Sequence, residues 1–374
     1  SWTTLPATDV LGLSIRKGRN HALDRIEAGE AIIYLKNASG DYYPDNSGGT
    51  YSPNVKPGKA ITVVATYDST AYSIFYGFIE ALTPSWVGKG GKGPVITLRC
   101  ADVMKNLARL LLNDGTGYSQ EVSGTRIDNV LDDLSANIGR DLDTGQSTVK
   151  ATGALANVNA MSHLQTVQLS EAGYMFVAGD GDVQFHDRHA RLKSPYTTSQ
   201  ATFGDDGGEM FYANVSLSSD DEMIMNDIRL TRDGGAEQVV SDATSQGDYG
   251  QRSLSRTGLL VTTDAEMLSQ AQYFLKRYKD PAMRATSITV HADRDADNLY
   301  PKVLGYDIGT RITLRLNQAS IDKEYHIESV HHTVDAKERR WATKWQLSDA
   351  SDQVYWALGV AGLSELGETT WLAY

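Results

Sequence analysis

Only a few side chains in this sequence have types and spacing that could perform chemistry. The run Gly88-Lys89-Gly90-Gly91-Lys92-Gly93 matches the GxGxxG pattern of dinucleotide-binding loops. Such a loop must follow a strand and open a helix, so that the N-terminus of the helix faces the phosphates. Here Pro94 and the strand-like run 95–100 follow instead, and no Walker A sequence is completed. We therefore predict a hairpin loop at 88–93.

A cluster of acidic residues has the spacing of a calcium loop. Asp293, Asp295 and Asp297 repeat the alternating acids that open an EF-hand. The remaining positions differ, because Asn298 replaces the glycine of the sharp turn and Leu304 replaces the bidentate glutamate. We predict a solvated loop here, with an unorthodox cation site as the alternative.

Histidines occur in two groups that could supply metal ligands. His186 and His189 flank Asp187, and His331 is followed directly by His332. Neighbouring residues of a strand point to opposite faces, so the second pair cannot chelate one ion. We predict surface or hydrogen-bonded histidines in both places, and we expect no metal or cofactor.

Patterns for a nucleophile are incomplete. The run Gly362-Leu363-Ser364-Glu365-Leu366 lacks the final glycine of a GxSxG elbow, and Cys100 is the sole cysteine. A carboxylate pair for glycoside hydrolysis stays open, because 47 acids make chance pairs inevitable. Nineteen Tyr and six Trp indicate strand cores and interfaces more than sugar-stacking platforms. We predict no catalytic residue.

Size and charge limit the class of protein. A chain of 374 residues exceeds what one core usually supports, so two or three domains are expected. The net charge of −12 argues against broad electrostatic binding to nucleic acid or anionic lipid. No uncharged apolar run approaches the roughly 18 residues of a membrane span, and the first twenty residues lack a secretory core. We expect no membrane insertion.

The elements predicted to position these residues divide the chain into three parts. Residues 1–100 contain β-branched and aromatic runs separated by turn clusters, at 31–36, 61–67, 72–79 and 95–100, which indicate a barrel or sandwich. Residues 101–195 contain segments with the apolar spacing of helices and segments with the alternation of strands. The predicted helices are 102–113, 125–139 with a capping box at Thr125 and Asp128 and a stop at Gly139, and 157–172, followed by a hairpin over 174–178 and 182–186.

Strands return in residues 196–374. They are predicted at 227–232 with a hairpin turn at Asp233-Gly234, and at 286–291, 311–316, 325–334 and 341–347. One helix is predicted at 264–279, and Trp341, Thr343, Trp345 and Leu347 should share one face of the last strand. No fixed-period repeat is present. The fold class expected is α+β and β-rich.

Several short motifs in a fixed order resemble those of minor tail proteins, or tail-tip hub proteins, of long-tailed bacteriophages. The motifs extend over nearly the whole chain. They are Gly18-Arg19, Ala28-Gly29, Leu35-Lys36-Asn37, Tyr43-Pro44-Asp45-Asn46, Phe75-Tyr76-Gly77, Leu169-Ser170-Glu171-Ala172-Gly173, Asp187-Arg188, Asn226-Asp227-Ile228, Tyr249-Gly250-Gln251-Arg252, Arg277-Tyr278-Lys279-Asp280-Pro281, Ile327-Glu328-Ser329-Val330-His331-His332 and Trp341-Ala342-Thr343.

The resemblance implies a fold like the central baseplate hub of contractile tails. It predicts an N-terminal barrel-like tube domain over 1–100, an α+β middle domain over 101–195 and a second tube domain over 196–374. It also predicts a homotrimeric ring at the tail tip of a virion. Such a hub joins the tail tube to the tip or fibres, contacts the distal tail ring and the tape measure protein, and lines the channel for phage DNA without specific binding.

Two other functions stay open from the sequence, a tail-associated peptidoglycan hydrolase and a carbohydrate-binding receptor protein. The chain reaches Tyr374 without an obvious receptor-binding, collagen-like or lytic extension, which favours a structural, non-enzymatic role. From the excess of acids over bases we further expect a channel lining with more Asp and Glu than Lys and Arg.

Overall fold

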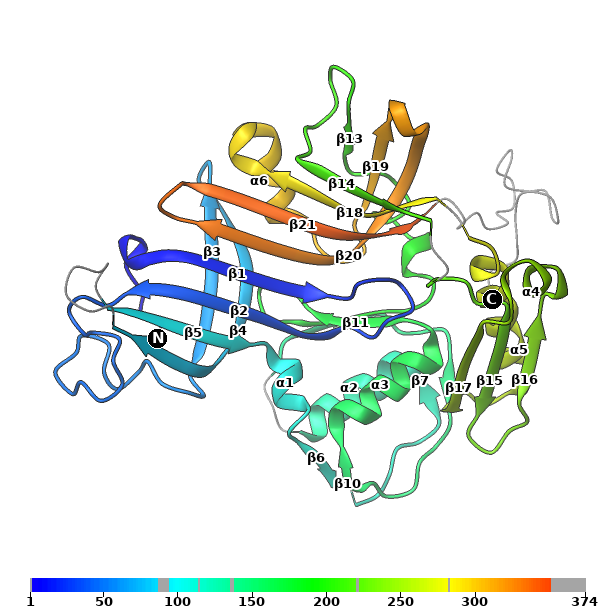
Figure 1. Cartoon of the computed structure of the whole chain (residues 1–374). Coiled ribbons are helices and arrows are strands. Elements are labelled where there is room, and N and C mark those ends of the chain that lie inside the picture. The colour runs from blue at the N-terminus through cyan, green and yellow to red at the C-terminus, as the bar shows by residue number, and fades with distance from the viewer. Residues whose placement is uncertain are drawn as a thin grey trace.

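The computed structural model of the chain describes residues 2–86, 94–113, 115–134, 138–219, 222–281 and 283–350. Its largest element is an eleven-stranded sheet, which extends across the molecule in Figure 1. Nine strands follow the order β14-β18-β21-β20-β1-β2-β5-β4-β3, and β19 and β13 are added beside β20. The bounds are β1 Val10–Gly18, β2 Glu27–Lys36, β3 Ala60–Tyr67, β4 Thr70–Ser85, β5 Val95–Ala101, β13 Thr202–Gly204, β14 Asn214–Ser218, β18 Arg284–His291, β19 Arg311–Leu316, β20 Ile321–Asp335 and β21 Arg340–Asp349.

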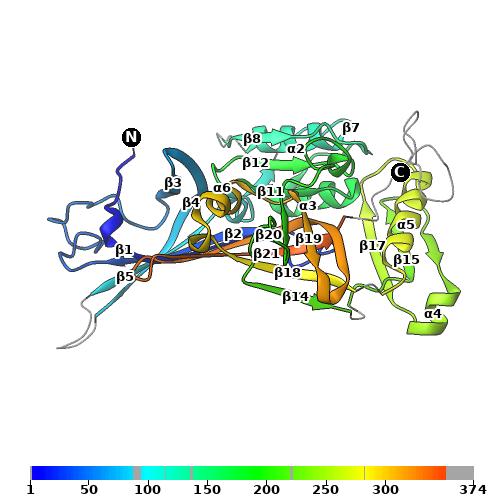
Figure 2. The same ribbon diagram turned by 90° about the horizontal axis from the view of Figure 1, so that it is seen from above.

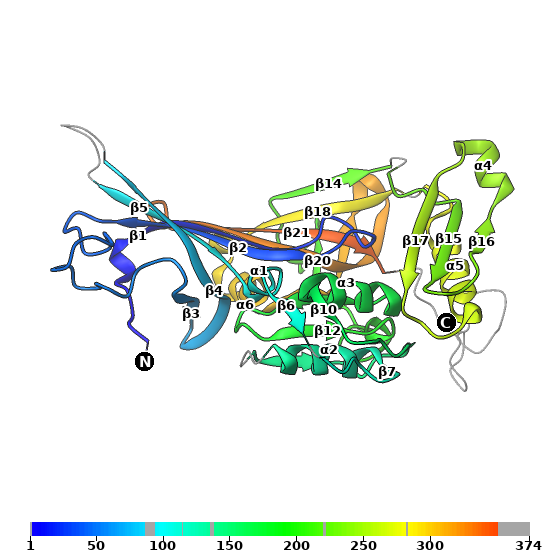
Figure 3. The same ribbon diagram turned by 90° about the horizontal axis from the view of Figure 1, so that it is seen from below.

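Alternating apolar residues give this sheet one buried face. In β2, Ala31, Ile33 and Leu35 are buried, whereas Tyr34 and Lys36 between and beyond them are exposed. Helix α6 (Ala296–Gly305) packs against the buried face and contributes Leu299 and Val303 to the main core. Helices α6, α2 and α3 all lie on this side of the strands β1, β2, β20 and β21, as Figures 2 and 3 show. We call the opposite side of β21, β20, β1, β2 and β5 the open face.

The sheet contains the same strand arrangement twice. The order β1-β2-β5-β4 on one side of the β1–β20 junction matches the order β14-β18-β21-β20 on the other, and every pair along both is antiparallel. The long strand of each unit, β4 or β20, pairs in its first half with the strand before it, β3 or β19. The loops differ, since residues 37–59 occupy the place of α6. This is why no constant period is visible in the sequence.

The middle of the chain forms a separate α+β layer below the sheet in Figure 1. Its core combines residues of α1, α2 and α3 with those of β11 and β12. The bounds are α1 Val103–Leu107, β6 Leu111–Asn113, β7 Glu121–Val122, α2 Ser123–Asp133, β8 Arg140–Leu142, β9 Thr148–Val149, β10 Ala156–Asn159, α3 Ala160–Glu171, β11 Tyr174–Val177 and β12 Val183–His186.

Two predicted helices of this region need correction. The helix predicted at 102–113 ends at Leu107, because Leu111–Asn113 pairs with β10 and buries Leu112. The helix predicted at 125–139 is α2, which begins at Ser123 and ends at Asp133. Its first amides donate to the carbonyls of Ser147 and Thr144, so no capping box forms. The predicted helix 157–172 and the hairpin after it are confirmed as α3 and β11–β12.

A small α/β unit lies at the opposite end of the molecule from β3, as Figure 1 shows. It has a three-stranded sheet in the order β16-β15-β17, covered by α5, with a core of its own. The bounds are β15 Asp227–Arg232, β16 Gln238–Ser241, α4 Ala243–Tyr249, β17 Ser253–Leu259 and α5 Asp264–Tyr278. The predicted strand 227–232, its hairpin and the helix 264–279 are therefore confirmed.

The fold class predicted from the sequence, α+β and β-rich, is confirmed. All nine predicted strands of the first and last parts coincide with observed strands, although β4 continues to Ser85, beyond its expected end at 79. The alternation in β21 leaves Thr343, Trp345 and Leu347 buried. Strand β1 was not predicted. The described strands form an open path rather than a closed barrel.

Candidate functional site

The residues first considered for chemistry are not gathered into one site. Residues 88–93 lie outside the described part of the chain, as does 362–366. Around the first of them, β4 and β5 pair as an antiparallel hairpin with Ser85 opposite Val95, so a strand and not a helix follows. Cys100 is buried in the sheet, and its burial raises the pKa of the thiol to about 12. Such a thiol is a poor nucleophile.

The three acids of the predicted calcium loop have separate partners. The Asp297 carboxylate accepts a hydrogen bond from the Tyr67 hydroxyl at 2.5 Å, and Asp293 accepts one from the Trp341 amide at 3.2 Å. Asp295 accepts from the side chain of Asn298. Within the described residues, no group of three or more His, Cys, Asp and Glu side chains could hold a metal ion.

The histidine pairs also separate. His331 lies on the open face, where its Nε2 is 2.9 Å from the Ser14 hydroxyl. His332 is buried on the other side, with its Nδ1 2.9 Å from the Thr343 hydroxyl and 3.2 Å from the indole nitrogen of Trp341. The prediction that the two point to opposite faces is confirmed. His186 is paired with Asp143 at 3.5 Å, while Asp187 accepts from the His189 amide.

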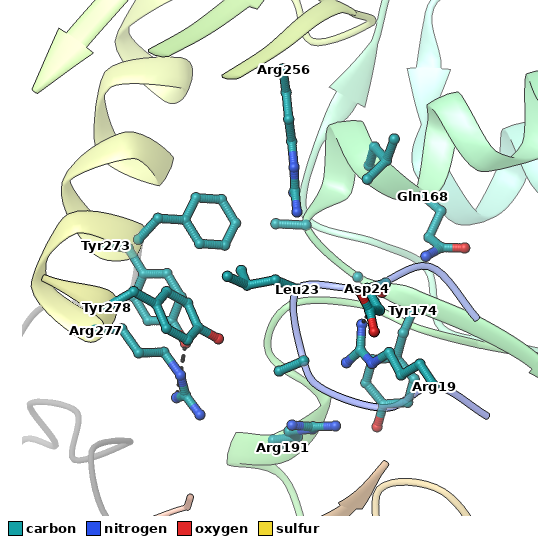
Figure 4. Close-up of a pocket in the computed structure, with 15 residues that line it drawn as sticks. Arg19, Leu23, Asp24, Gln168, Tyr174, Arg191, Arg256, Tyr273, Arg277 and Tyr278 are labelled. Carbon is teal, nitrogen blue, oxygen red and sulfur yellow. Dashed lines mark hydrogen bonds between the residues drawn. The ribbon is translucent and has the colours of Figure 1, made fainter. Parts of the chain in front are cut away.

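Arginine and aromatic side chains surround a small pocket between the β1–β2 loop, the end of α3 and α5, shown in Figure 4. Its volume is about 80 Å³, well below the roughly 300 Å³ at which sites for small organic ligands begin. Arg277 donates to the Tyr273 hydroxyl and to the Asp349 carbonyl. Arg19 and Arg191 are directed to a buried carboxylate, that of Glu328. The pocket walls are thus held by contacts within the chain.

Glu328 is the centre of a buried ionic cluster. Its Oε2 lies 2.7 Å from Nε of Arg19, and its Oε1 lies 2.7 Å from Nη1 of Arg191. Ser348 donates a further hydrogen bond at 2.5 Å. Burial alone would raise the pKa of this carboxyl, but the two guanidinium groups and the hydroxyl hold it well below its usual range. The cluster ties β1, β20 and β21 to the 3₁₀ turn Ala190–Leu192.

Gly18 and Arg19 reach this cluster through a close approach of two backbones. Gly18 lies opposite Ser329 in the β1–β20 pair, with φ of +103°. A Cβ at Gly18 would lie 2.3 Å from the Glu328 carbonyl oxygen, so no other residue fits. The motif Gly18-Arg19 therefore meets the motif Ile327-Glu328-Ser329.

Two further motif pairs behind the resemblance also meet in space. The fully buried Glu171 accepts from the Ser147 amide at 2.6 Å and lies 3.7 Å from the Arg188 guanidinium. Asn226 accepts from the Arg252 amide at 2.8 Å and donates to the Gly250 carbonyl. These interactions join segments 17 to 26 residues apart, so the motifs hold the fold together.

The edges of the main sheet are the other candidate site. β14 forms one end of the described strand path, and its neighbourhood exposes Phe211 and Leu217 by 62% and 39%. At the other end, β3 covers the outer edge of β4 only from Thr70 to Phe78. The remaining outer edge of β4, from Glu80 to Ser85, carries no strand among the described residues. Strand edges without a neighbouring strand are sites for pairing with another chain.

No protein-family model and no curated protein sequence matches this chain. Solved structures do. A tail protein from Neisseria meningitidis MC58 superposes with a TM-score of 0.62 at 12% identity, over 91% of this chain and 92% of that one. The 43 kDa tail protein of prophage MuSo2 from Shewanella oneidensis superposes with a TM-score of 0.60 at 14% identity, over 91% of this chain and 94% of that one.

A third structure of similar fold is the c3393 protein of E. coli, a component of the type VI secretion system that resembles the T4 tail proteins gp27 and gp5. Its TM-score is 0.53 at 10% identity, over 91% of this chain and 73% of that one. The chain therefore has the fold of phage tail proteins, and the resemblance to tail hubs is confirmed at the level of fold. No helix in the described ranges is long and apolar enough to span a membrane.

Proposed function

We propose that this chain is a structural, non-enzymatic virion protein that forms the hub at the distal end of a phage tail. It joins the tail tube to the tip or fibres and lines the channel for DNA. The observation that carries the proposal is the duplicated four-stranded arrangement within a fold that matches phage tail proteins over 91% of the chain. Contacts with the distal tail ring and the tape measure protein belong to the same proposal.

The duplication supports a ring of three copies. Along β20, one edge pairs first with β19 and then, from Ser329 to Asp335, with β1, the first strand of the other unit. The equivalent strand β4 pairs first with β3, and within the described ranges no strand pairs with its edge from Glu80 to Ser85. The first strand of the second unit is β14, and no described strand pairs with its outer edge. Pairing of β4 with β14 of the next copy would repeat the β1–β20 junction.

Three chains joined in this way present six equivalent units, which match a six-fold tail tube to a three-fold tip. We assign the units to a tube domain over 1–100 and a second tube domain over 196–374, with the middle domain over 101–195. The two tube domains share one sheet through the β1–β20 pair.

Native mass spectrometry of the assembled particle and images of the tail test this function. The expected result is a trimer located as a three-fold ring at the distal end of the tail tube. Six-fold or two-fold placement, or absence from the virion, would overturn the proposal. A monomer in dilute solution is compatible with it, because the joint between copies is a single edge-strand pair.

A further inference from the structure

The open face of the sheet carries three exposed cationic side chains, one each on β21, β1 and β5. Lys344 of β21 lies opposite His331 of β20, and His331 lies opposite Arg16 of β1. One strand, β20, separates Lys344 from Arg16, so their Cα atoms lie two strand spacings, about 10 Å, apart. Arg99 of β5 lies on the same face, opposite Ile32 of β2. Arg16, Arg99 and Lys344 are all exposed.

The charge of this face differs from that of the whole chain. Among the paired residues on this face, including Glu27 beside the bulge at Gly18, there are five Lys and Arg and three Asp and Glu. The whole chain has 35 Lys and Arg and 47 Asp and Glu. The cations are Arg16, Lys36, Arg99, Arg340 and Lys344, and the acids are Glu27, Glu30 and Asp335. Within the described ranges, none of these cations lies within 4 Å of a carboxylate oxygen.

His331 lies between Lys344 and Arg16, and its pKa responds to both cations. Its half-buried position lowers the pKa of the imidazole, and the neighbouring Arg16 and Lys344 lower it further. Arg16 donates only to the neutral side chain of Asn20 among the described residues. Among the described residues, Arg16, Arg99 and Lys344 form no ion pair, although Glu30 lies opposite Arg16 in the next strand.

We propose that the open face binds the phosphate backbone of double-stranded DNA through Arg16, Arg99 and Lys344. This deepens the proposed function and rests on it: in the proposed ring we assign the open face to the channel side, because the helices α6, α2 and α3 lie on the opposite side of the sheet. Cations spaced across strands attract phosphates without reading the sequence. In this proposal the contact retains the DNA end by charge, which differs from the acidic lining expected from composition.

Binding of a short mixed-sequence duplex to the purified full chain, measured at several salt concentrations, tests this inference. The variant R16E/R99E/K344E is compared with the matched control K105E/R294E/K302E. The control makes the same change of net charge on α1, the 3₁₀ turn Ala292–Arg294 and α6, which lie behind the sheet. A second variant, R16Q/R99Q/K344Q, removes the cations without adding acids.

We expect wild type and the control to bind with similar affinity. Both variants of the face should lose about 10-fold or more, and the slope of log affinity against log salt should fall by about one for each phosphate contact removed. An equal loss in the control, or no binding by wild type at low salt, would overturn the inference. Native mass of each variant is measured separately, so that loss of the ring is distinguished from loss of DNA binding.

Discussion

The Nε atom of Arg19 lies 2.7 Å from Oε2 of Glu328, although 309 residues separate the two side chains. The pair fastens the end of β1 to β20 beside the junction of the two four-stranded units. Both side chains are more than nine-tenths buried, so neither charge has water as an alternative partner. The relative position of the two halves of the sheet therefore depends on this contact.

Substitution E328Q should destabilise the protein by about 3–5 kcal/mol, because Arg19 and Arg191 would stay buried without a counter-charge. Urea unfolding monitored by tryptophan fluorescence measures the change. The matched control is E324Q on the same strand, whose carboxylate pairs with Arg311 but is 37% exposed and should contribute about 1 kcal/mol or less. Equal losses in the two variants would contradict a central role for the buried cluster.

Acid should destabilise the fold through His332. Burial lowers the pKa of this imidazole to about 3 in the folded state, with further lowering by Lys17 and His331, against 6.5 as its ordinary value. The unfolded chain therefore binds the proton first, and stability is lost as the pH falls from 6.5 towards 3. In H332N, the slope of unfolding free energy against pH should be shallower by about 1.4 kcal/mol per pH unit. Parallel slopes for wild type and H332N would refute this.

An acid placed on β14, the end strand of the described path, should prevent formation of the proposed ring. Leu217 of β14 is 39% exposed and lies on the edge assigned to the next copy, so L217D should reduce the trimer without lowering stability by more than about 0.5 kcal/mol. The control is V239D on β16, the edge of the small three-stranded sheet, where the side chain is 45% exposed. A trimer that persists in L217D, measured by native mass, would exclude β14 from the interface.

Chelation should leave the protein unchanged. The carboxylates of Asp293, Asp295 and Asp297 have hydrogen-bond partners within the chain, and these partners do not converge on one point. Melting and ring formation with and without a chelator should therefore agree within error. A fall of several degrees in the melting temperature on chelation would establish a cation site in this segment.

Sequence periodicity and helix end signals predicted those strands and helices whose residues alone determine their conformation. The alternation through Trp341, Thr343, Trp345 and Leu347 identified β21, because burial of one face demands period two. The helix α5 was recognisable from its apolar stripe and from Pro281 beyond its end. Strand β1 was missed because two glycines and the pair Arg16-Lys17 dilute its apolar residues, of which Leu13 and Ile15 reach the core.

The candidate site depends on contacts that no local pattern contains. Nothing near Arg19 in the sequence indicates a partner at Glu328, and a carboxylate is buried there only because two guanidinium groups arrive from distant segments. The helix predicted at 102–113 failed for a related reason, since pairing with β10 outweighs the helical spacing of Leu110 and its neighbours. The cations of the open face likewise required the register of the strands from β21 to β5.

The β1–β20 pair lies within one chain, so it is tethered, whereas the β4–β14 pair proposed between copies would not be. A tethered joint re-forms at a high effective concentration, while a free joint depends on the concentration of protein. Around a ring of three chains the two kinds of joint alternate. Dilution can open only the free ones, and each departing chain removes two neighbouring units together. Such a ring dissociates by thirds and never loses a single unit of the six.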